Sequence, residues 1–207
     1  GAADRNQQGA HRGWGPSPRP ILAGPFFSHY NRVPSTDVAG APAARFPQRH
    51  PMSTINHLLF VCAGNICRSP MAEVLFRDLA RSHPQLEKLD VSSAGTIALN
   101  GNLPCAGSVD AMRKKFGLEM ATHRARPLSR RLAADLVLTM DREPERDAKS
   151  LKLQARVEML GDFVGTGEEV EDPYGGPSRR YREVARQLER LIELAVAKLD
   201  KETAAAS

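Results

Sequence analysis

Four short apolar segments stand out between residues 56 and 161 of this chain. Residues 58–61 and 136–140 are apolar runs between polar segments, which is typical of parallel strands that are covered on both faces. Residues 89–93 and 158–160 predict two further strands. Each segment is too short to be a helix by itself, so together they predict the strands of one sheet.

Helical patterns separate the predicted strands. Residues 70–80 and 106–116 predict two helices, and Gly117 is expected to end the second. From about residue 178, apolar side chains recur at helical spacing opposite a face of Arg and Glu. Strands alternating with helices predict an α/β fold. We expect a doubly wound parallel sheet of four strands, with helices on both faces and the active site at the carboxyl ends of the strands.

Residues 1–51 lack any such periodicity. They hold eight of the fifteen prolines, and six arginines against two aspartates give them +4 of the net charge of +5. This composition predicts a disordered Pro/Gly/Arg-rich extension, followed by one domain over residues 52–207. Because Met52 stands just before the first predicted strand, we expect residues 1–51 to be upstream sequence. A targeting or docking arm is the alternative.

Charge and cysteine usage narrow the class of protein. The basic character belongs mostly to residues 1–51, so it does not indicate a nucleic-acid partner. The apolar stretch at 21–27 is broken by Gly and Pro and is too short for a membrane span, so no membrane partner is expected. Three cysteines, two of them expected to react as thiols, suit a reducing compartment, and we predict a cytoplasmic protein.

The most informative motif lies between the first predicted strand and helix. Cys62 and Arg68 are separated by five residues there, and a strand, a tight turn and a helix in this order aim backbone N–H groups and a helix dipole at one point. These groups and the Arg68 cation would stabilise a thiolate on Cys62. Arg68 can also bind two phosphoryl oxygens with its planar fork. Gly64 suits the sharp turn, and Ser69 can donate a hydrogen bond to the sulfur.

A second motif supplies an acid. Asp172 precedes Pro173 in a turn-rich segment, which favours a side chain carried on a loop. Its carboxyl can protonate the leaving oxygen of a phosphate ester and then activate water. The implied reaction passes through a phosphocysteine and needs no metal or other cofactor.

Other interpretations of the cysteines are weaker. A zinc site needs three or four ligands, and Cys105 is distant in the sequence with no cysteine paired to it. An ATP-binding phosphate loop is excluded because no Gly-Lys-Ser or Gly-Lys-Thr follows the glycine.

Residues 62–73 resemble the signature loop of low-molecular-weight protein tyrosine phosphatases, and the likeness extends over roughly residues 56–200. Further motifs follow in the order of that family. They are Ser93–Thr96, Thr122–Arg126, Ala134–Asp141, Val157–Gly161 and Asp172–Gly175.

The resemblance implies a role for each matching residue. Cys62 is the expected nucleophile, Arg68 the phosphate clamp and Asp172 the general acid. The residues expected to bind substrate are Gly64, Asn65, Ile66, Cys67, Leu99 and Tyr174. The residues expected to support the loop are Ser69, Ser93 and His123, together with Asn65. Taken singly, Asn65 can be an ordinary turn residue, His123 a surface histidine, and Ile66 and Leu99 plain packing residues.

Cys67 carries a further implication of the resemblance. In the family, the two positions occupied by Cys62 and Cys67 can form a reversible disulfide that protects the nucleophile from overoxidation. The alternative is a buried, inert Cys67.

The implied function is hydrolysis of phosphotyrosine in a protein substrate, with three alternatives. Protein-arginine phosphatases of the superfamily carry threonine where Ile66 stands, and a bulky apolar side chain there favours a phenyl ring. Thioredoxin-coupled arsenate reductases need two further relay cysteines, and with Cys67 inside the loop that relay is incomplete. A non-catalytic phosphoprotein-binding module would not need Asp172.

Overall fold

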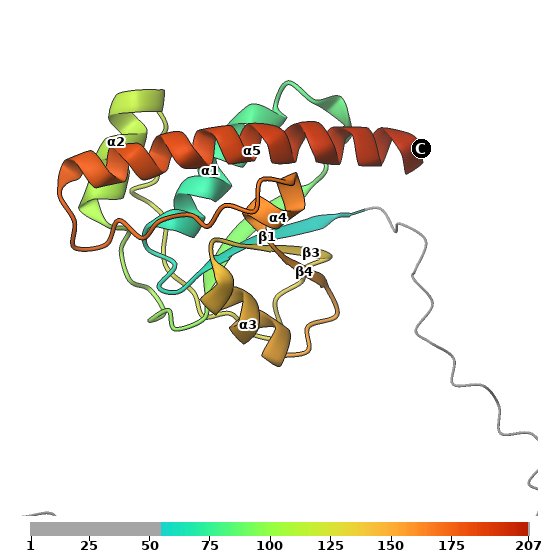
Figure 1. The fold of residues 1–207 in the computed structure, drawn as a ribbon, viewed down its shortest axis with the longest axis horizontal. Coiled ribbons are helices and arrows are strands. Elements are labelled where there is room, and N and C mark those ends of the chain that lie inside the picture. The colour runs from blue at the N-terminus through green and yellow to red at the C-terminus, as the bar shows by residue number, and fades with distance from the viewer. Residues whose placement is uncertain (1–54, 207) are drawn as a thin grey trace, which may run out of the picture. The chain divides into compact units, whose positions relative to one another are not determined.

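Four parallel strands form the centre of the computed structural model, which describes residues 55–206 (Figure 1). The predicted extension over residues 1–51 lies outside the described residues. The strands run side by side in the order β2-β1-β3-β4. They are β1 (His57–Cys62), β2 (Asp90–Gly95), β3 (Leu136–Thr139) and β4 (Arg156–Met159). The predicted four-stranded parallel sheet is therefore confirmed.

The helices cover both faces of this sheet. They are α1 (Arg68–Ala80), α2 (Ala106–Phe116), α3 (Arg142–Ser150), α4 (Leu160–Val164) and α5 (Ser178–Ala206), with a 3₁₀ turn, η1, at Pro84–Leu86. The long helix α5 packs along α1, α2 and α4, whereas α3 packs on β3 and β4 at the opposite face (Figure 1). The expected helices on both faces are present.

Alternating side chains of β1 divide the core between the two faces. Leu58, Phe60 and Cys62 belong to the large cluster under α1, α2 and α5, while Leu59 and Val61 belong to the smaller cluster that includes Ala148 of α3. These β1 side chains are almost completely buried. Burial of each larger apolar side chain stabilises the fold by about 1.5–3 kcal/mol. The sheet is thus fixed from both sides, and Cys62 at its end is fixed with it.

Two helices, α2 and α3, contrast in how well the sequence predicts them. Helix α2 has the predicted bounds, and Gly117 ends it with a left-handed φ of 69°. Helix α3 was not predicted because its nine residues are mostly charged. Hydrogen bonds from Lys149 and Arg142 to Glu145 stabilise this helix instead. Burial opposes the charge of Glu145, but these two hydrogen bonds hold the pKa of its carboxyl below the usual range.

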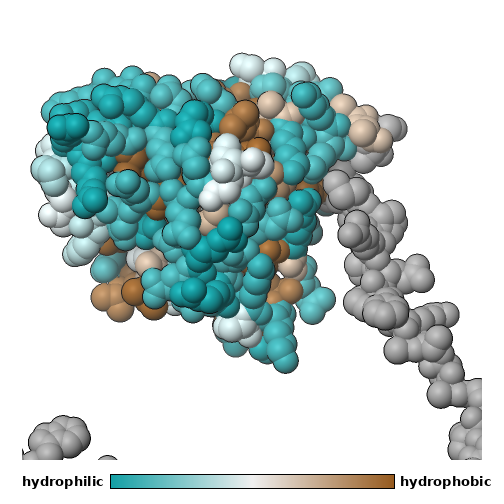
Figure 2. All heavy atoms as spheres, viewed as in Figure 1, coloured by the Kyte–Doolittle hydropathy of each residue, from teal (hydrophilic) through white to brown (hydrophobic). Residues whose placement is uncertain are grey.

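The surface is mainly hydrophilic on the face drawn in Figure 2, with apolar residues in small patches. Five large apolar residues are strongly exposed among the described residues, namely Ile97, Leu99, Leu103, Tyr174 and Leu194. Four of them belong to the two loops beside the site described below. Within residues 55–206, no helix has both the length and the apolar character that crossing a bilayer requires.

Candidate active site

The loop between β1 and α1 crosses the carboxyl edge of the sheet. Cys62 is the last residue of β1, and Arg68 is the first residue of α1. Strand β1 lies between β2 and β3, so the chain leaves it first to one side and later to the other. In doubly wound sheets such a switch point is where ligands bind. The predicted strand–turn–helix motif therefore lies where a ligand site is expected.

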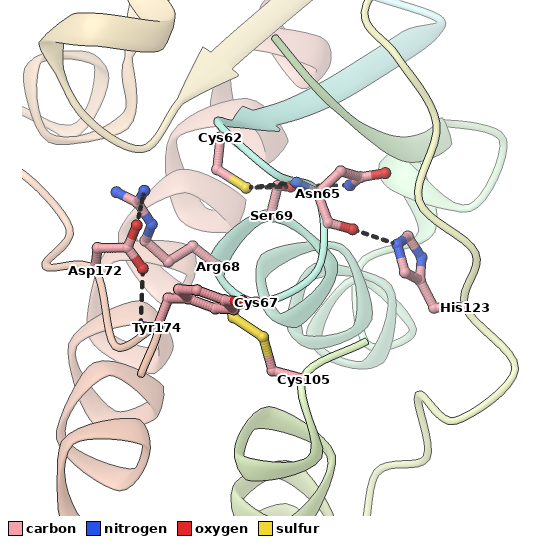
Figure 3. The surroundings of a disulfide bond; sticks show 9 residues. All are labelled: Cys62, Asn65, Cys67, Arg68, Ser69, Cys105, His123, Asp172 and Tyr174. Carbon is pink, nitrogen blue, oxygen red and sulfur yellow. Dashed lines mark hydrogen bonds and ion pairs between the residues drawn. A yellow bond between two sulfur atoms is a disulfide. The ribbon is translucent and has the colours of Figure 1, made fainter. Parts of the chain in front are cut away.

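The Cys62 sulfur makes hydrogen bonds with Asn65 of its own loop and with Ser69 in the first turn of α1 (Figure 3). The backbone N–H of Asn65 donates to Sγ at 3.3 Å, and the Ser69 hydroxyl lies 3.0 Å from it. Cys62 is a free thiol with 2% of its surface exposed. Two polar groups therefore contact the sulfur that the sequence predicts to be the nucleophile.

Asn65 holds the loop in its shape. Its φ of 52° is left-handed, a conformation that is uncommon outside glycine but tolerated by asparagine. The completely buried side chain donates to the hydroxyls of Ser69 at 3.0 Å and Ser93 at 2.9 Å, and accepts from the backbone N–H of Arg126 at 2.9 Å. Nε2 of His123 donates to the Asn65 carbonyl at 2.9 Å. Asn65, Ser69, Ser93 and His123 thus form one connected network.

The segment after β2 supports the loop from behind. The N–H groups of Thr96 and Ile97 donate to the carbonyls of Cys62 and Ala63 at 3.1 and 3.0 Å. A Cβ on Gly95 would lie only 2.4 Å from the Ala63 carbonyl oxygen, so only glycine permits this approach. Ser93 is anchored in turn by Glu73, which accepts its hydroxyl at 2.7 Å.

Three oxygen atoms accept hydrogen bonds from the guanidinium of Arg68. Nη1 donates to Asp141 and, at 3.1 Å, to the carbonyl of Val170, whereas Nη2 donates to Oδ2 of Asp172 at 2.7 Å. Arg68 is only 4% exposed. Asp141 also accepts the backbone N–H of Glu143 at 3.0 Å and so caps α3. The cation is therefore fixed at the base of the pocket.

Asp172 reaches Arg68 from the loop between α4 and α5. Its Oδ1 accepts the N–H of Tyr174 at 3.0 Å, and half of its side-chain surface is exposed. One oxygen is thus held by its own turn and the other by the cation. Asp172 and Tyr174 both face the Cys62 loop (Figure 3).

The loop and the Asp172 segment enclose a pocket of about 220 Å³. Its lining residues are Cys62, Ala63, Gly64, Ile66, Cys67, Arg68, Ile97, Asp172 and Tyr174. Leu99, which was expected to contact substrate, is 70% exposed and is not among these lining residues, whereas Ile97 of the same loop is.

The pairing of the cysteines also differs from the expectation. Cys67 is bonded to Cys105, with 5.6 Å between their Cα atoms, and Cys62 is not paired with Cys67. The view that Cys105 has no partner is therefore wrong, whereas a reversible Cys62–Cys67 disulfide stays a prediction. The cause is the path of the chain: the backbone N–H of Cys105 donates to the carbonyl of Ile66 at 2.8 Å, which brings the two cysteines together.

Sequence reasoning gave no role to Asp141, Glu73, Arg126 or Ile97. A signal for Asp141 was present, because it directly follows β3, and the ends of neighbouring parallel strands meet at one edge. Within residues 55–206, no group of three or more His, Cys, Asp or Glu side chains is arranged to hold a metal ion.

Known proteins are similar to this chain in sequence and in fold. The family model described as low molecular weight phosphotyrosine protein phosphatase matches residues 57–205. The low molecular weight protein-tyrosine phosphatase A of Mycobacterium bovis is 37% identical over 142 residues, which cover 64% of this chain and 85% of that protein.

Two solved structures give the same result. A low molecular weight protein tyrosine phosphatase from T. tengcongensis superimposes with a TM-score of 0.63 at 34% identity, covering 69% of this chain and 98% of the other. The arginine phosphatase YwlE, solved as a Cys-to-Ser mutant with a phosphorylated active-site serine, has a TM-score of 0.63 at 30% identity, covering 70% and 96%. This chain belongs to the low molecular weight phosphotyrosine protein phosphatase family.

Proposed function

We propose that this protein hydrolyses phosphotyrosine in protein substrates, with Cys62 as nucleophile, Arg68 as phosphate clamp and Asp172 as general acid. One observation carries the proposal. A free thiol that accepts a backbone N–H, a buried guanidinium and a loop-borne carboxyl line a single pocket. A module that only binds phosphate would not need the carboxyl beside the cation.

In the first step, the Cys62 thiolate attacks phosphorus and forms a phosphorus–sulfur bond. The bond to the tyrosine oxygen breaks, and Asp172 transfers a proton to that oxygen. Arg68 binds two phosphoryl oxygens and stabilises the charge that develops on them. The phosphorylated serine in the Cys-to-Ser mutant of the arginine phosphatase relative supports transfer to this position.

In the second step, water attacks the phosphocysteine. Asp172, now ionised, takes a proton from the water, and the phosphorus–sulfur bond breaks. The Ser69 hydroxyl, 3.0 Å from the sulfur, stabilises the departing thiolate. No step uses a metal ion.

The walls of the pocket favour a phenyl ring. Ile66, Ile97 and Tyr174 supply apolar surface, and one of the nine lining residues, Asp172, is acidic. A phosphotyrosine ring gains from apolar contact, whereas a guanidinium needs acceptors that such walls do not supply. Because a relative is an arginine phosphatase, phosphoarginine is the second candidate substrate.

Initial rates on matched phosphotyrosine and phosphoarginine peptides, measured across pH, decide between the two. We expect the larger kcat/KM with phosphotyrosine, and a larger value with phosphoarginine would overturn this choice. The Cys62→Ser variant is the control: it should lose turnover and still bind inorganic phosphate. If the unaltered protein binds phosphate but hydrolyses neither peptide nor para-nitrophenyl phosphate, it is a binding module instead.

The cellular setting follows from the same chemistry. Cys62 must be a free thiol to act as the nucleophile, so we propose a reducing, cytoplasmic compartment, in which the Cys67–Cys105 disulfide would be transient. Labelling of the protein in fractionated cells tests this.

A further inference from the structure

The third cysteine is the feature that the proposed hydrolysis leaves unused. Cys62 and Cys67 both line the pocket, and Cys67 is bonded to Cys105 at the start of α2 (Figure 3). Cys62 keeps its thiol. The structure therefore combines a free thiol at Cys62 with a disulfide at Cys67, five residues further along the chain and in the same pocket.

The positions of Cys67 and Cys105 do not depend on the disulfide alone. The Cys105 backbone is tied to Ile66, next to Cys67, by its hydrogen bond of 2.8 Å. The carbonyl of Cys105 accepts the N–H of Val109 at 3.1 Å, which anchors it in the first turn of α2. The far end of the same segment is tied to the loop through Ile97 and Ala63. After reduction, the two thiols therefore stay side by side.

We propose that Cys105 is the resolving thiol of a three-cysteine relay that carries oxidation by a hydroperoxide away from Cys62. The inference rests on the proposed function to the extent that Cys62 is the reactive thiolate of the pocket. The disulfide in the structure is then the end product of the relay.

The relay has three balanced steps. The Cys62 thiolate attacks the peroxide, the oxygen–oxygen bond breaks, and a sulfenic acid and hydroxide form. The Cys67 thiolate then attacks the Cys62 sulfur and displaces hydroxide, which gives a Cys62–Cys67 disulfide. Finally, the Cys105 thiolate attacks the Cys67 sulfur and releases the Cys62 thiolate. The peroxide gains two electrons, and the thiols of Cys67 and Cys105 lose them.

The surroundings of each sulfur favour this direction. The sulfur that must leave in the last step belongs to Cys62, which accepts the Asn65 N–H at 3.3 Å and lies 3.0 Å from the Ser69 hydroxyl. Cys67 is 4% exposed, which favours attack by the neighbouring Cys105 thiol over attack by an external thiol. Cys105 is only partly buried, which leaves the finished disulfide open to an external thiol reductant.

The relay changes what oxidation does to the enzyme. A simple Cys62–Cys67 disulfide protects the nucleophile but stops the reaction until a reductant arrives. With Cys105 available, the first equivalent of peroxide is consumed in forming the Cys67–Cys105 disulfide, and the Cys62 thiolate is regenerated. A second equivalent finds no free Cys67 and leaves Cys62 as the sulfenic acid, and a third equivalent oxidises it to the sulfinic acid.

The test uses the full chain, reduced with dithiothreitol, freed of it without oxygen, and treated with one equivalent of hydrogen peroxide. Catalase stops the reaction, free thiols are alkylated, and non-reducing peptide mass spectrometry maps the disulfides. Activity is read without reductant and is expressed relative to the starting activity of each variant. The variants are Cys62→Ser, Cys67→Ser, Cys105→Ser and Cys105→Ala.

For the unaltered protein, we expect most of the activity to remain and a Cys67–Cys105 disulfide to appear. Both Cys105 variants should lose most of their activity, carry a Cys62–Cys67 disulfide and recover with dithiothreitol. Cys67→Ser should lose activity as the Cys62 sulfenic acid, because no thiol at position 67 is left to displace the hydroxide. Cys62→Ser should form no Cys67–Cys105 disulfide at this dose, because the entry point is gone.

Two results would overturn the relay. The first is a Cys67–Cys105 disulfide that forms in Cys62→Ser as fast as in the unaltered protein. The second is a pair of Cys105 variants that keep their activity as well as the unaltered protein does. Disulfide mapping does not require turnover, so an absence of phosphatase activity would refute the proposed function while the maps still decide the relay.

Discussion

Arg68 and Asp172 form a salt bridge, with 2.7 Å between Nη2 and Oδ2, across a sequence separation of 104 residues. The groups proposed as phosphate clamp and general acid therefore bind each other. An incoming phosphoryl group and the Asp172 carboxylate are both anions, so they compete for the guanidinium. Binding of the anion and positioning of the acid are linked through this one contact.

Asp172→Asn should separate the two roles of the carboxylate. We expect kcat for phosphotyrosine to fall by about 10²–10⁴, because the proton donor is lost. Inorganic phosphate should inhibit this variant at lower concentration, because a neutral amide competes less for Arg68 and does not repel the anion. Steady-state kinetics with phosphate as inhibitor measure both effects.

Leaving-group dependence and a neighbouring carboxylate provide the controls for Asp172. The loss should be smaller with para-nitrophenyl phosphate, whose leaving group needs less help from an acid. Glu171→Gln alters the adjacent carboxylate, which lies 3.7 Å from Arg180, and should change neither constant. Equal losses on good and poor leaving groups would remove Asp172 from the acid role.

Asp141 is expected to affect catalysis through its contact with the guanidinium of Arg68. Asp141→Asn removes the charge that holds Nη1 but keeps an oxygen that can accept the Glu143 N–H at the start of α3. A hydrogen bond between charged groups contributes about 1.5–3 kcal/mol, so we expect kcat/KM to fall by about ten- to a hundredfold. Kinetics with phosphotyrosine peptide check this.

Asp141→Ala distinguishes catalysis from helix capping. It removes the cap as well, which typically costs about 0.5–2 kcal/mol of stability. Thermal unfolding should therefore show a lower Tm for Asp141→Ala than for Asp141→Asn, while both lose activity. If Asp141→Asn keeps full activity, Val170 and Asp172 alone suffice to hold the guanidinium.

The sequence predicts those parts of the site that depend on local patterns. Cys62 and Arg68 are fixed by a strand, a turn and a helix that are each visible as patterns, and the parallel topology brings Asp172 to the same edge. The bounds of α2 follow from its periodicity and from Gly117. These features could be predicted because they depend on local sequence patterns or on the topology of the sheet.

The remainder depends on contacts that no pattern records. The partner of Cys67 is set by the path of the segment between β2 and α2, an irregular stretch without periodicity. The path of the same stretch also places Ile97, and not Leu99, among the residues that line the pocket. Helix α3 is too polar to be recognised, so the position of Asp141 at its start was not recognised either.

Asn65 offers a test of the loop conformation separate from its side chain. Asn65→Gly and Asn65→Ala both lose the hydrogen bonds to Ser69, Ser93 and Arg126. Only glycine adopts the φ of 52° without strain, and alanine costs about 1–2 kcal/mol more there. We expect both variants to lose activity, with the lower Tm for Asn65→Ala. Equal Tm values would show that the loop relaxes away from this backbone conformation.

The loop after β2 provides the last test, because Ile97 and Leu99 are about equally exposed, at 73% and 70%, but only Ile97 lines the pocket. Burial of one methylene against a ligand contributes about 0.8 kcal/mol, or roughly a fourfold change in affinity. Ile97→Ala should therefore raise KM for a phosphotyrosine peptide several-fold at little cost in kcat, because the apolar contact is the same in the ground state and the transition state. Leu99→Ala, matched in size and exposure, should leave KM unchanged. The reverse order, with Leu99→Ala the more damaging, would mean that substrate binds across the outer surface of the loop and that the pocket wall at Ile97 does not contact the ring.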